Sequence, residues 1–577
     1  MRKNSSTRHL KMIPSARQVR AAIGILLGGV SAMGSAYAVG IETDNPDIKM
    51  SWDNTFKYSA GWRLKDADAK VADNSIGPQI NTNDGDLNFA KGAMISNRLD
   101  LMSEFDLRYK NAYGLRISGS AWNDDVYSRS NDNAGAMGGA LVNTTSVPYN
   151  KFSDATRAIN GRKAEIQDAF VYGSFAPSDM NVNVKLGQFT QLYGESLFFG
   201  YNGIAGAQTP LDLARALSVP NSQFKEVAMP VKQLSAQVQI NPTLSVGAYY
   251  QFEWRKNRLP GVGSYFSFAD FTDAGGENLL LGDIPNGPQK ASVHRGEDLK
   301  ASDSGQGGAQ VKLKVGDTEY GFYVAQFHDK MPQFYARPGV NPLGGLNSIG
   351  GPIIGDYVMV YGENIKTYGA SISTLLGETN VAGELSFRTN QPLMAIGNAM
   401  VVDATANGNN NPAYPVGDTM HLNMSAITVL GASPLWQGAS FVGEFAYNQR
   451  MKITRNEAAL DPMATQSASA IQLVFQPEYF QVLPGLDLQV PIGLSYGVSG
   501  RSSVAGVGSL MPSEGNGNIS LGIKADYKKT WQAGLNYTHY FGNSGSVIKY
   551  NAPAPTLSYD NFHGDRDFIS LSIQRTF

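Results

Sequence analysis

Segments in which apolar and polar residues alternate strictly recur along almost the whole chain. In residues 94–109, for example, Leu99 and Leu101 alternate with Arg98 and Asp100. Successive side chains of a β-strand point to opposite faces, so this pattern is typical of a strand between an apolar and a polar environment. The same alternation runs through 243–255, 486–498, 517–527 and 530–542. A chain built this way is expected to be all-β.

Eighteen such strands are predicted, and two classes of connection alternate between them. The predicted strands are 48–64, 94–109, 112–127, 163–176, 181–190, 231–240, 243–255, 307–315, 319–329, 365–376, 380–389, 421–430, 438–451, 468–479, 486–499, 517–527, 530–542 and 566–577. Short turns such as 110–111 and 528–529 alternate with long connections such as 191–230 and 256–306. A β-sandwich or propeller also has two-faced strands but does not require this alternation. The pattern favours a transmembrane antiparallel β-barrel of about 18 strands, with short turns at one end and long outer loops that partly fill the lumen at the other.

The composition is consistent with a barrel and excludes several other classes of protein. Gly accounts for 63 of 577 residues and charged residues for 17%, against typical shares of about 7% and 25%. The chain is too apolar to be disordered, and basic residues do not accumulate beyond the first twenty, so no nucleic-acid partner is expected. It has no Cys, which excludes disulfides and thiolate metal sites. Beyond the N-terminal region, no run of 18 apolar residues offers a helical span.

The first 38 residues have the features of a secretory signal peptide. Six basic residues and no acidic ones precede an apolar run at 21–32, which is too short for a permanent membrane helix. Ala36-Tyr37-Ala38 then supplies a small-residue cleavage site. We therefore predict a cleaved leader at 1–38 and a single barrel domain at 39–577, with a retained N-terminal anchor as the alternative.

If the apolar face of each strand meets lipid, the polar face lines the lumen. The charged candidates for the lumen are Arg98, Asp100, Glu104, Asp106, Arg108, Arg116, Glu253, Arg255, Glu384, Arg388, Glu444 and Arg450. Both signs are mixed, so no ring of one sign indicates selectivity for anions or cations. The alternative is that these residues only pair with one another across neighbouring strands. Aromatic residues at strand ends are typical of the girdles at membrane interfaces, and the candidates are Trp52, Trp62, Tyr109, Tyr113, Trp254, Tyr447, Tyr527, Trp531 and Phe541.

Two of the long loops carry apolar residues that need a buried environment. Loop 191–230 is predicted to fold inward and gate the lumen, with a short helix that begins at Thr209 and Pro210. Its gating candidates are Glu195, Phe198, Phe199, Tyr201, Asp212, Leu213 and Leu217, and Glu195 and Asp212 are expected to pair with Arg98, Arg108 or Arg388. Loop 256–306 carries the aromatic residues Tyr265, Phe266, Phe268 and Phe271. The alternative is that loop 191–230 caps the outside and packs against 256–306.

The last strand ends on an aromatic residue. Residues 566–577 alternate up to a terminal Phe577, which resembles the signal that the barrel-assembly machinery reads. Arg575 stands where an aromatic residue is usual. The assembly machinery is therefore an expected partner, together with outer-membrane lipid and lipopolysaccharide.

The chain resembles a large proteobacterial family known as domain of unknown function thirteen-oh-two. The residues that carry the resemblance are Leu186-Gly187-Gln188-Phe189, Tyr193-Gly194-Glu195-Ser196-Leu197, Trp254-Arg255, Pro260, Gly263-Ser264-Tyr265-Phe266 and Asp270. Tyr193 stands where the family often has a tryptophan. The resemblance covers nearly the whole chain after the leader and implies an outer-membrane protein. Members often lie near genes for the breakdown of lipid-like or aromatic compounds, which implies uptake of hydrophobic molecules.

No motif points to catalysis. The chain has neither a His-Glu-x-x-His zinc motif nor a Gly-x-Ser-x-Gly elbow between a strand and a helix. We therefore expect a non-catalytic channel in the bacterial outer membrane, without cofactor or metal, for small hydrophobic or amphipathic molecules. The alternatives are a structural or adhesive barrel that binds surfaces or partner proteins, and a general porin.

Overall fold

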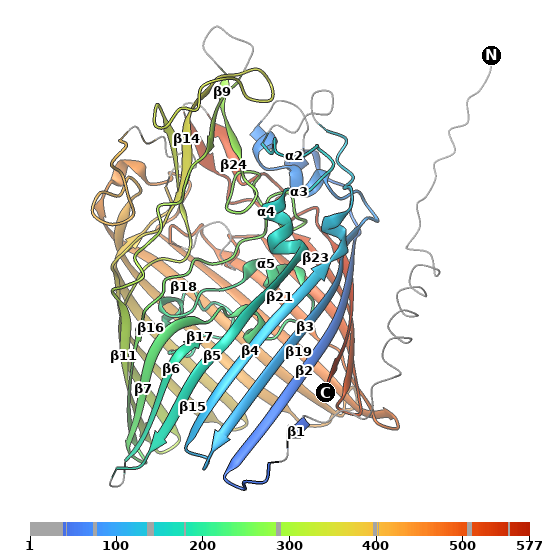
Figure 1. Cartoon of the computed structure of the whole chain (residues 1–577), viewed down its shortest axis with the longest axis vertical. Coiled ribbons are helices and arrows are strands. Elements are labelled where there is room, and N and C mark those ends of the chain that lie inside the picture. Colours follow the sequence, from blue (N-terminus) through green and yellow to red (C-terminus); the bar gives the residue numbers. More distant parts are fainter. Residues whose placement is uncertain are drawn as a thin grey trace, which may run out of the picture.

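The chain folds into one closed antiparallel β-barrel of 18 strands, as predicted (Figure 1). The computed structural model describes residues 39–41, 43–72, 78–135, 143–177, 180–283, 290–395, 401, 403–504, 511–551 and 554–577, so the predicted leader lies outside the described residues. The barrel strands are β2 (Ile48–Arg63), β3 (Met94–Tyr109), β4 (Tyr113–Asp124), β5 (Arg162–Phe175), β6 (Asn181–Phe189), β7 (Val231–Asn241), β8 (Leu244–Gln251), β11 (Gln306–Val315), β12 (Thr318–Phe327), β15 (Ile365–Leu376), β16 (Thr379–Pro392), β17 (Val416–Leu430), β18 (Gly438–Arg455), β19 (Ser467–Leu483), β20 (Leu486–Gln489) continued by β21 (Ile492–Ser499), β22 (Gly517–Tyr527), β23 (Trp531–Phe541) and β26 (Phe568–Thr576).

The first and last strands close the barrel. β2 pairs with β26 from Thr55 opposite Thr576 to Arg63 opposite Phe568. Beyond the end of β26, the short strand β1 (Val39–Ile41) continues the ladder and pairs with residues 50–52 of β2. Closure leaves no unpaired edge, which a sheet inside a lipid bilayer requires because lipid offers no hydrogen-bond partners.

The two faces of the wall differ as the alternation predicts. Leu99 is 53% exposed on the outer face, whereas its neighbours Arg98 and Asp100 are 4% and 5% exposed. Phe322 is 55% exposed and the adjacent Tyr323 only 3%. The apolar residues therefore cover the outside of the barrel, and the polar residues meet the contents of the lumen.

The connections alternate as predicted, with the short turns at one end and nine long loops at the other. Figure 1 shows the C-terminus and β1 near the end that carries the short turns. The turn between β22 and β23 places Lys528 and Lys529 at φ of 54° and 55°, the conformation that very tight hairpins demand. We call the end with the long loops the outer end.

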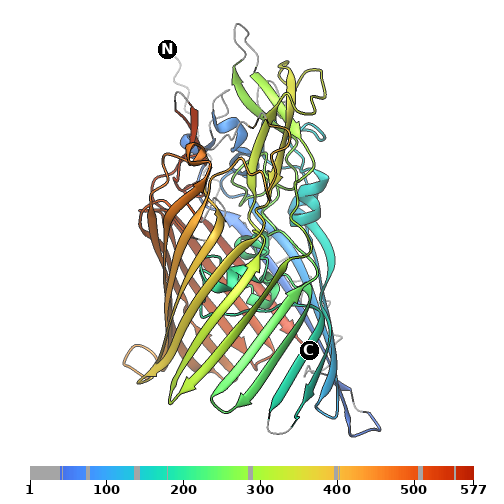
Figure 2. The same cartoon turned by 90° about the vertical axis from the view of Figure 1, so that its left-hand side faces the viewer.

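Regular structure in the outer loops was not predicted. A four-stranded sheet stands on the outer end and consists of β9 (Asn278–Asp283), β10 (Lys290–Arg295), β13 (Gln333–Pro338) and β14 (Ile353–Val360) (Figure 2). β24 (Ile548–Asn551) and β25 (Ala554–Leu557) form a hairpin beside it. These strands are short, and β14 pairs with strands from two loops, so local alternation alone could not reveal them.

The helices of the described residues are all short. They are α2 (Ala69–Ala72), η1 (Pro78–Asn81), α3 (Asp84–Leu87), η2 (Asp125–Ser128), α4 (Asp154–Thr156), η3 (Arg157–Gly161), η4 (Ile204–Ala207), α5 (Leu213–Ser218), α6 (Phe224–Val227) and η5 (Glu457–Ala459). None of the helices in the described ranges has the length and apolarity needed to cross a membrane.

The largest hydrophobic cluster lies at the outer end. It joins Trp254, Leu259, Phe268, Phe271 and Tyr357 from different outer loops and also includes Leu213 of α5. A second cluster packs Phe89, Phe152, Tyr265 and Phe266 together. The four aromatic residues of loop 256–306 are therefore buried among the outer loops, where they hold these loops together as a cap.

Phe577 provides a test of the closing strand. Its ring stacks on Phe56 at 5.7 Å between centroids, and its backbone exchanges hydrogen bonds with Asn54. We expect Phe577→Ala to lower the yield of heat-modifiable barrel in membranes severalfold, because the closing pair of strands β2 and β26 loses the ring that stacks on Phe56. Phe577→Tyr keeps the ring and serves as the control. Equal yields of the alanine variant and the wild type would show that the terminal ring does not assist assembly.

Candidate functional site

Loop 191–230 leaves β6 and returns to β7 through the interior of the barrel. Figures 1 and 2 both show its helices inside the ring of strands. Its apolar residues account for this course: Phe199, Ile204 and Leu213 are 3%, 1% and 3% exposed. Burying a large apolar side chain stabilises a fold by about 1.5–3 kcal/mol, so the loop is favoured inside rather than in water.

Two carboxylates of the wall bind the backbone of the first half of this loop. Glu384 on β16 accepts hydrogen bonds from the amides of Glu195 at 2.6 Å and Ile204 at 2.9 Å. Glu444 on β18 accepts from the amides of residues 197–199 through one oxygen. Irregular backbone inside a barrel needs such partners, because its own amides have no strand neighbour.

A wall arginine binds the carbonyl groups of the same segment. Nη2 of Arg388 donates to the carbonyl oxygens of Tyr201 at 2.9 Å, Asn202 at 3.0 Å and Gly203 at 2.8 Å. Arg388 is only 2% exposed. The wall therefore holds residues 195–204 by their main chain. Its carboxylates accept hydrogen bonds from the amides, and its guanidinium donates hydrogen bonds to the carbonyl oxygens.

The side chain of Asn202 extends this contact into the wall. Its amide nitrogen donates to Asn423 Oδ1 at 2.8 Å, and its oxygen meets His421 Nδ1 and Asn448 Nδ2, each at 3.1 Å. All four side chains are buried. This network fixes the position of the loop along the wall, because each polar atom would lose a partner if the loop shifted.

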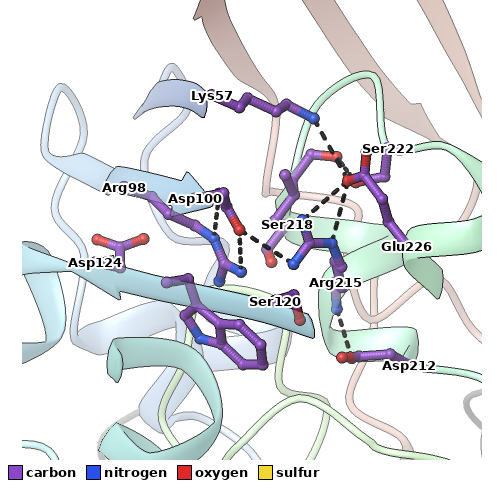
Figure 3. Close-up of polar contacts among 12 residues, drawn as sticks. Lys57, Arg98, Asp100, Ser120, Asp124, Asp212, Arg215, Ser218, Ser222 and Glu226 are labelled. Atoms are coloured by element: carbon purple, nitrogen blue, oxygen red, sulfur yellow. Dashed lines mark hydrogen bonds and ion pairs between the residues drawn. The ribbon is translucent and has the colours of Figure 1, made fainter. Parts of the chain in front are cut away.

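Charged side chains hold the second half of the loop (Figure 3). Lys57 on β2 and Arg98 and Asp100 on β3 face Arg215 of α5 and Glu226 of α6. We call these five residues the lumen charge cluster. Arg98 and Arg215 both contact Asp100, at 2.8 and 3.1 Å, and Arg215 also contacts Glu226 at 2.9 Å. Nζ of Lys57 lies 4.0 Å from Glu226.

A second chain of ion pairs borders the lumen charge cluster. Arg258 from the outer loops bridges Asp212 on loop 191–230 and Glu165 on β5, and its guanidinium lies 2.6 Å from Oε2 of Glu165. The Trp122 ring lies under Arg98, Arg215 and Arg258, at 4.8, 5.9 and 5.8 Å from the guanidinium carbons to the ring centroid. Removing one partner of a buried ion pair costs about 3–5 kcal/mol, so these contacts resist displacement of the loop.

Two mainly apolar cavities lie on the outer side of the loop, and each also has one aspartate in its lining, Asp560 in the larger and Asp329 in the smaller. One of about 180 Å³ is lined by Leu213, Leu217 and Tyr540 among others, and one of about 120 Å³ by Tyr201, Met331 and Met394 among others. Both are also lined by Leu259 and Phe268. Methionine and aromatic linings suit flat or flexible apolar molecules.

A larger and charged cavity lies on the inner side. It measures about 560 Å³ and is bounded by Phe224 and Lys225 of α6 and by the lumen faces of β3 to β6. Glu104 there pairs with Arg116 and Lys225, and Arg116 also contacts Asp168 at 3.2 Å. The segment 213–228 thus lies between the larger outer cavity, which it lines through Leu213 and Leu217, and the charged inner cavity.

Buried charges also tie the outer loops to the barrel. Arg566 forms a two-point contact with Asp86, at 2.7 and 2.8 Å, and Arg63 lies 2.9 Å from Asp565. Nearby, the Asp270 carboxylate accepts from the amides that begin α3, Asn83 at 2.7 Å and Asp84 at 3.2 Å. Burial raises the pKa of Asp84 to about 7, and burial beside Asp84 raises the pKa of Asp270 as well.

The structure places the predicted gating residues inside the barrel but pairs their acids differently. Glu195 lies 3.5 Å from Lys312, and Asp212 pairs with Arg258, so the expected pairing with Arg98, Arg108 or Arg388 is wrong. Arg388 instead binds backbone carbonyls. The alternative of packing against 256–306 also holds in part, because the amide of Leu213 donates to the carbonyl of Arg258.

The predicted start of the loop helix is wrong as well. α5 begins at Leu213, and Asp212 caps it through a 2.9 Å bond to the amide of Arg215. Leu211 and Asp212 form β-bridges to Ala228 and Arg258. These bridges hold the backbone extended, so a helix cannot begin at Thr209.

The strand predicted over 243–255 ends early. β8 stops at Gln251, where its pairing with β7 and β11 stops. Glu253 and Arg255 therefore lie on the outer loop, where they bond the backbone of Lys232 and Pro230, and they are not strand residues of the lumen wall. Trp254 is not a girdle residue, since it is buried against Tyr361 at 4.7 Å between ring centroids.

The other predicted lumen residues occupy different surroundings. The most buried are Arg98, Asp100, Glu384, Arg388 and Glu444, and all five contact the inward loop or the lumen charge cluster. Glu104, Asp106, Arg108 and Arg116 line the inner cavity. Arg450 on β18 is half-buried.

Several residues of the site were not predicted. Lys57 stands on the polar face of a predicted strand, so the alternation could have indicated it. The same holds for Glu165 on the predicted strand 163–176. Glu226 and Arg258 carry no such signal, because they lie in loops and their partners come from distant segments. In the described part of the chain, no three His, Cys, Asp or Glu side chains are grouped to hold a metal ion.

Glu444 provides a test of the loop anchor. We expect Glu444→Ala to increase the frequency of channel opening in planar bilayers, because three loop amides lose their acceptor and each unpaired buried amide costs about 1–3 kcal/mol. Glu444→Gln keeps one acceptor oxygen and should have a smaller effect. Glu478→Ala, on the neighbouring strand β19 and without a bond to the loop among the described residues, is the control. Identical recordings for Glu444→Ala and wild type would contradict this role.

Asp84 provides a test of pH dependence in the cap. Its pKa is raised on folding, so its stabilising contribution is present at acid pH and is lost as the pH rises through about 7. We expect limited proteolysis of the outer loops to become faster as the pH is raised. The increase should be smaller in an Asp84→Asn variant, whose side chain at position 84 cannot ionise. Asp154→Asn alters an exposed carboxylate and should behave as wild type. A wild-type pH profile that matches that of Asp84→Asn would refute the assignment.

Comparison with known proteins identifies the family. No curated protein sequence matches the chain. Solved structures similar to it include Acinetobacter baumannii OccAB1 (TM-score 0.41, 9% identity, covering 94% of this chain and 98% of that chain). Others are Pseudomonas aeruginosa OpdK with vanillate (0.39, 11%, 92% and 98%) and the outer membrane channel DcaP of Acinetobacter baumannii (0.33, 10%, 93% and 99%). The family model described as "Protein of unknown function (DUF1302)" matches residues 19–577, and the chain belongs to that family.

Proposed function

We propose that this chain is an outer-membrane channel for small hydrophobic or amphipathic molecules and that loop 191–230 is its gate. The observation that carries the proposal is the position of segment 213–228 between a mainly apolar outer cavity and a charged inner cavity. A molecule that enters from outside would first meet cavities whose apolar residues include Leu213, Leu217 and Phe268 and whose linings contain one aspartate each. The cavity lined by several charged side chains lies beyond the loop. Such an order suits a molecule with an apolar body.

The closed barrel and its apolar outer face support the proposed location in the outer membrane. A wall with lipid-compatible residues outside and polar residues inside is the arrangement of outer-membrane barrels. We propose that the protein reaches that membrane with a cleaved leader and with the help of the barrel-assembly machinery, and that lipid and lipopolysaccharide surround it there. No catalytic step is part of the proposal.

The two halves of the loop suggest how a gate would move. Residues 195–204 are bound to the wall through their main chain. Residues 211–228 are held by side-chain ion pairs, by apolar contacts and by main-chain bonds of 211–214 to Arg258 of an outer loop. The second half can move without breaking the wall contacts of the first half, because the amide of Met229 donates to the carbonyl of Pro210 at 2.9 Å. This bond joins the two ends of segment 211–228.

The bond between Met229 and Pro210 allows a clean deletion. We expect a variant in which two glycines replace residues 211–228 to show a severalfold higher conductance in planar bilayers than the wild type. Residues 210 and 229 already touch, so the rest of the loop should stay in place. An inserted two-glycine variant between Lys528 and Lys529, at the opposite end of the barrel, controls for altered chain length. Wild-type conductance in a heat-modifiable deletion variant would refute the gate.

Growth and binding assays separate the proposal from its rivals. Loss of growth on apolar carbon sources in a strain without the gene would support uptake. Loss of attachment alone would favour an adhesive barrel, and a large steady conductance of the wild-type protein would favour a general porin.

A further inference from the structure

Lys57 is a buried cation that depends on the inward loop for its counter-charge. It is 3% exposed, and Glu226 provides its only ion pair among the described residues. Its Nζ has no hydrogen-bond partner in the described part of the chain. The 4.0 Å separation from Glu226 is wider than a charge-assisted hydrogen bond, so the ammonium faces a carboxylate that it does not fully engage.

The other wall cations near the loop have acids of their own on the wall. Arg98 contacts Asp100 through two bonds of 2.8 and 2.9 Å, and Arg116 contacts both Glu104 and Asp168. If segment 213–228 moves away, these pairs persist. Lys57 alone then loses its ion-pair partner, because Asp100 stays bound to Arg98.

An uncompensated charge in a narrow lumen attracts a counter-ion strongly, because low-dielectric walls concentrate its field. The lumen charge cluster joins the wall to the segment between the cavities, since α5 lines an outer cavity through Leu213 and Leu217 and α6 lines the inner one through Phe224 and Lys225. A molecule that displaces segment 213–228 would pass Lys57 while its tail still contacts the apolar residues of the outer cavity.

We propose that Glu226 occupies the position of a ligand's acidic head group, and that the ligands of this channel are amphipathic anions with one anionic head and an apolar tail. The inference rests on the proposed channel function and names its substrate class. The head of the ligand replaces the Glu226 carboxylate at Lys57, which offsets the loss of the loop's ion pairs. The apolar tail fits the outer cavities, which are lined by leucine, methionine and aromatic residues.

A cationic head finds no equivalent position. Lys225 pairs with Glu104, but Glu104 keeps Arg116 as a partner when the loop leaves. Asp100 likewise keeps Arg98. The charges of the wall therefore distinguish anionic from cationic molecules even though both signs are present in similar number.

The test uses octanoate and octylammonium, which share a tail and differ in the charge of the head. Glu226→Gln removes the internal carboxylate with little change of shape and leaves Lys57 and Arg215 without it. We expect octanoate to bind this variant at least tenfold more tightly than the wild type in calorimetric titrations of the full-length, detergent-solubilised barrel. The double variant Glu226→Gln/Lys57→Met should lose this gain, and Glu226→Gln/Lys314→Met, which alters an exposed lysine of β11, should retain it. Octylammonium should show no gain.

Equal affinities of octanoate for wild type and Glu226→Gln, or a gain that survives Lys57→Met, would overturn the proposal. Glu226→Gln/Lys57→Gln provides a polar substitute if methionine impairs folding, which heat-modifiable migration reports. The deletion of 211–228 keeps the two claims separate. If the deletion variant conducts ions but octanoate binds wild type and Glu226→Gln equally well, only the proposed substrate class is wrong. If the deletion variant shows no conductance, the proposed channel function is wrong.

Discussion

The need of an irregular main chain for hydrogen-bond partners inside a barrel governs this structure. A strand of the wall satisfies its backbone through its neighbours, but a loop that crosses the lumen cannot. Here Glu384, Glu444 and Arg388 supply the missing partners from the wall. Their buried charges would be costly if the loop were absent, so wall and loop stabilise each other.

This mutual dependence divides the loop into a fixed part and a displaceable part. The fixed part has main-chain bonds to several strands, whose geometry depends on the wall as a whole. The displaceable part has side-chain ion pairs, and its main-chain to main-chain bonds outside the loop run to Arg258 of an outer loop and not to the wall. A charged ligand can replace one partner of such an ion pair without distorting the backbone. The contact between Pro210 and Met229 lies where the two parts meet.

The outer loops form a cap that is stabilised differently from the wall. Their aromatic residues pack with one another, and Arg566 and Arg63 bind Asp86 and Asp565 at the base of the cap. Asp84 and Asp270 add an interaction that depends on protonation. The cap therefore has a stability of its own, which varies with pH.

The sequence by itself determined the barrel, because a two-residue period states which side chain faces lipid and which faces the lumen. It indicated all 18 wall strands, the alternation of turns and loops, and the inward course of the apolar loop 191–230. It could not indicate that Asp212 pairs with Arg258, that β8 ends at Gln251, or that distant loop segments form the sheet of β9, β10, β13 and β14. Those features depend on contacts between residues far apart in the chain. Only the tertiary structure brought Glu226 to Lys57, because the wall places one of them and the folded loop the other.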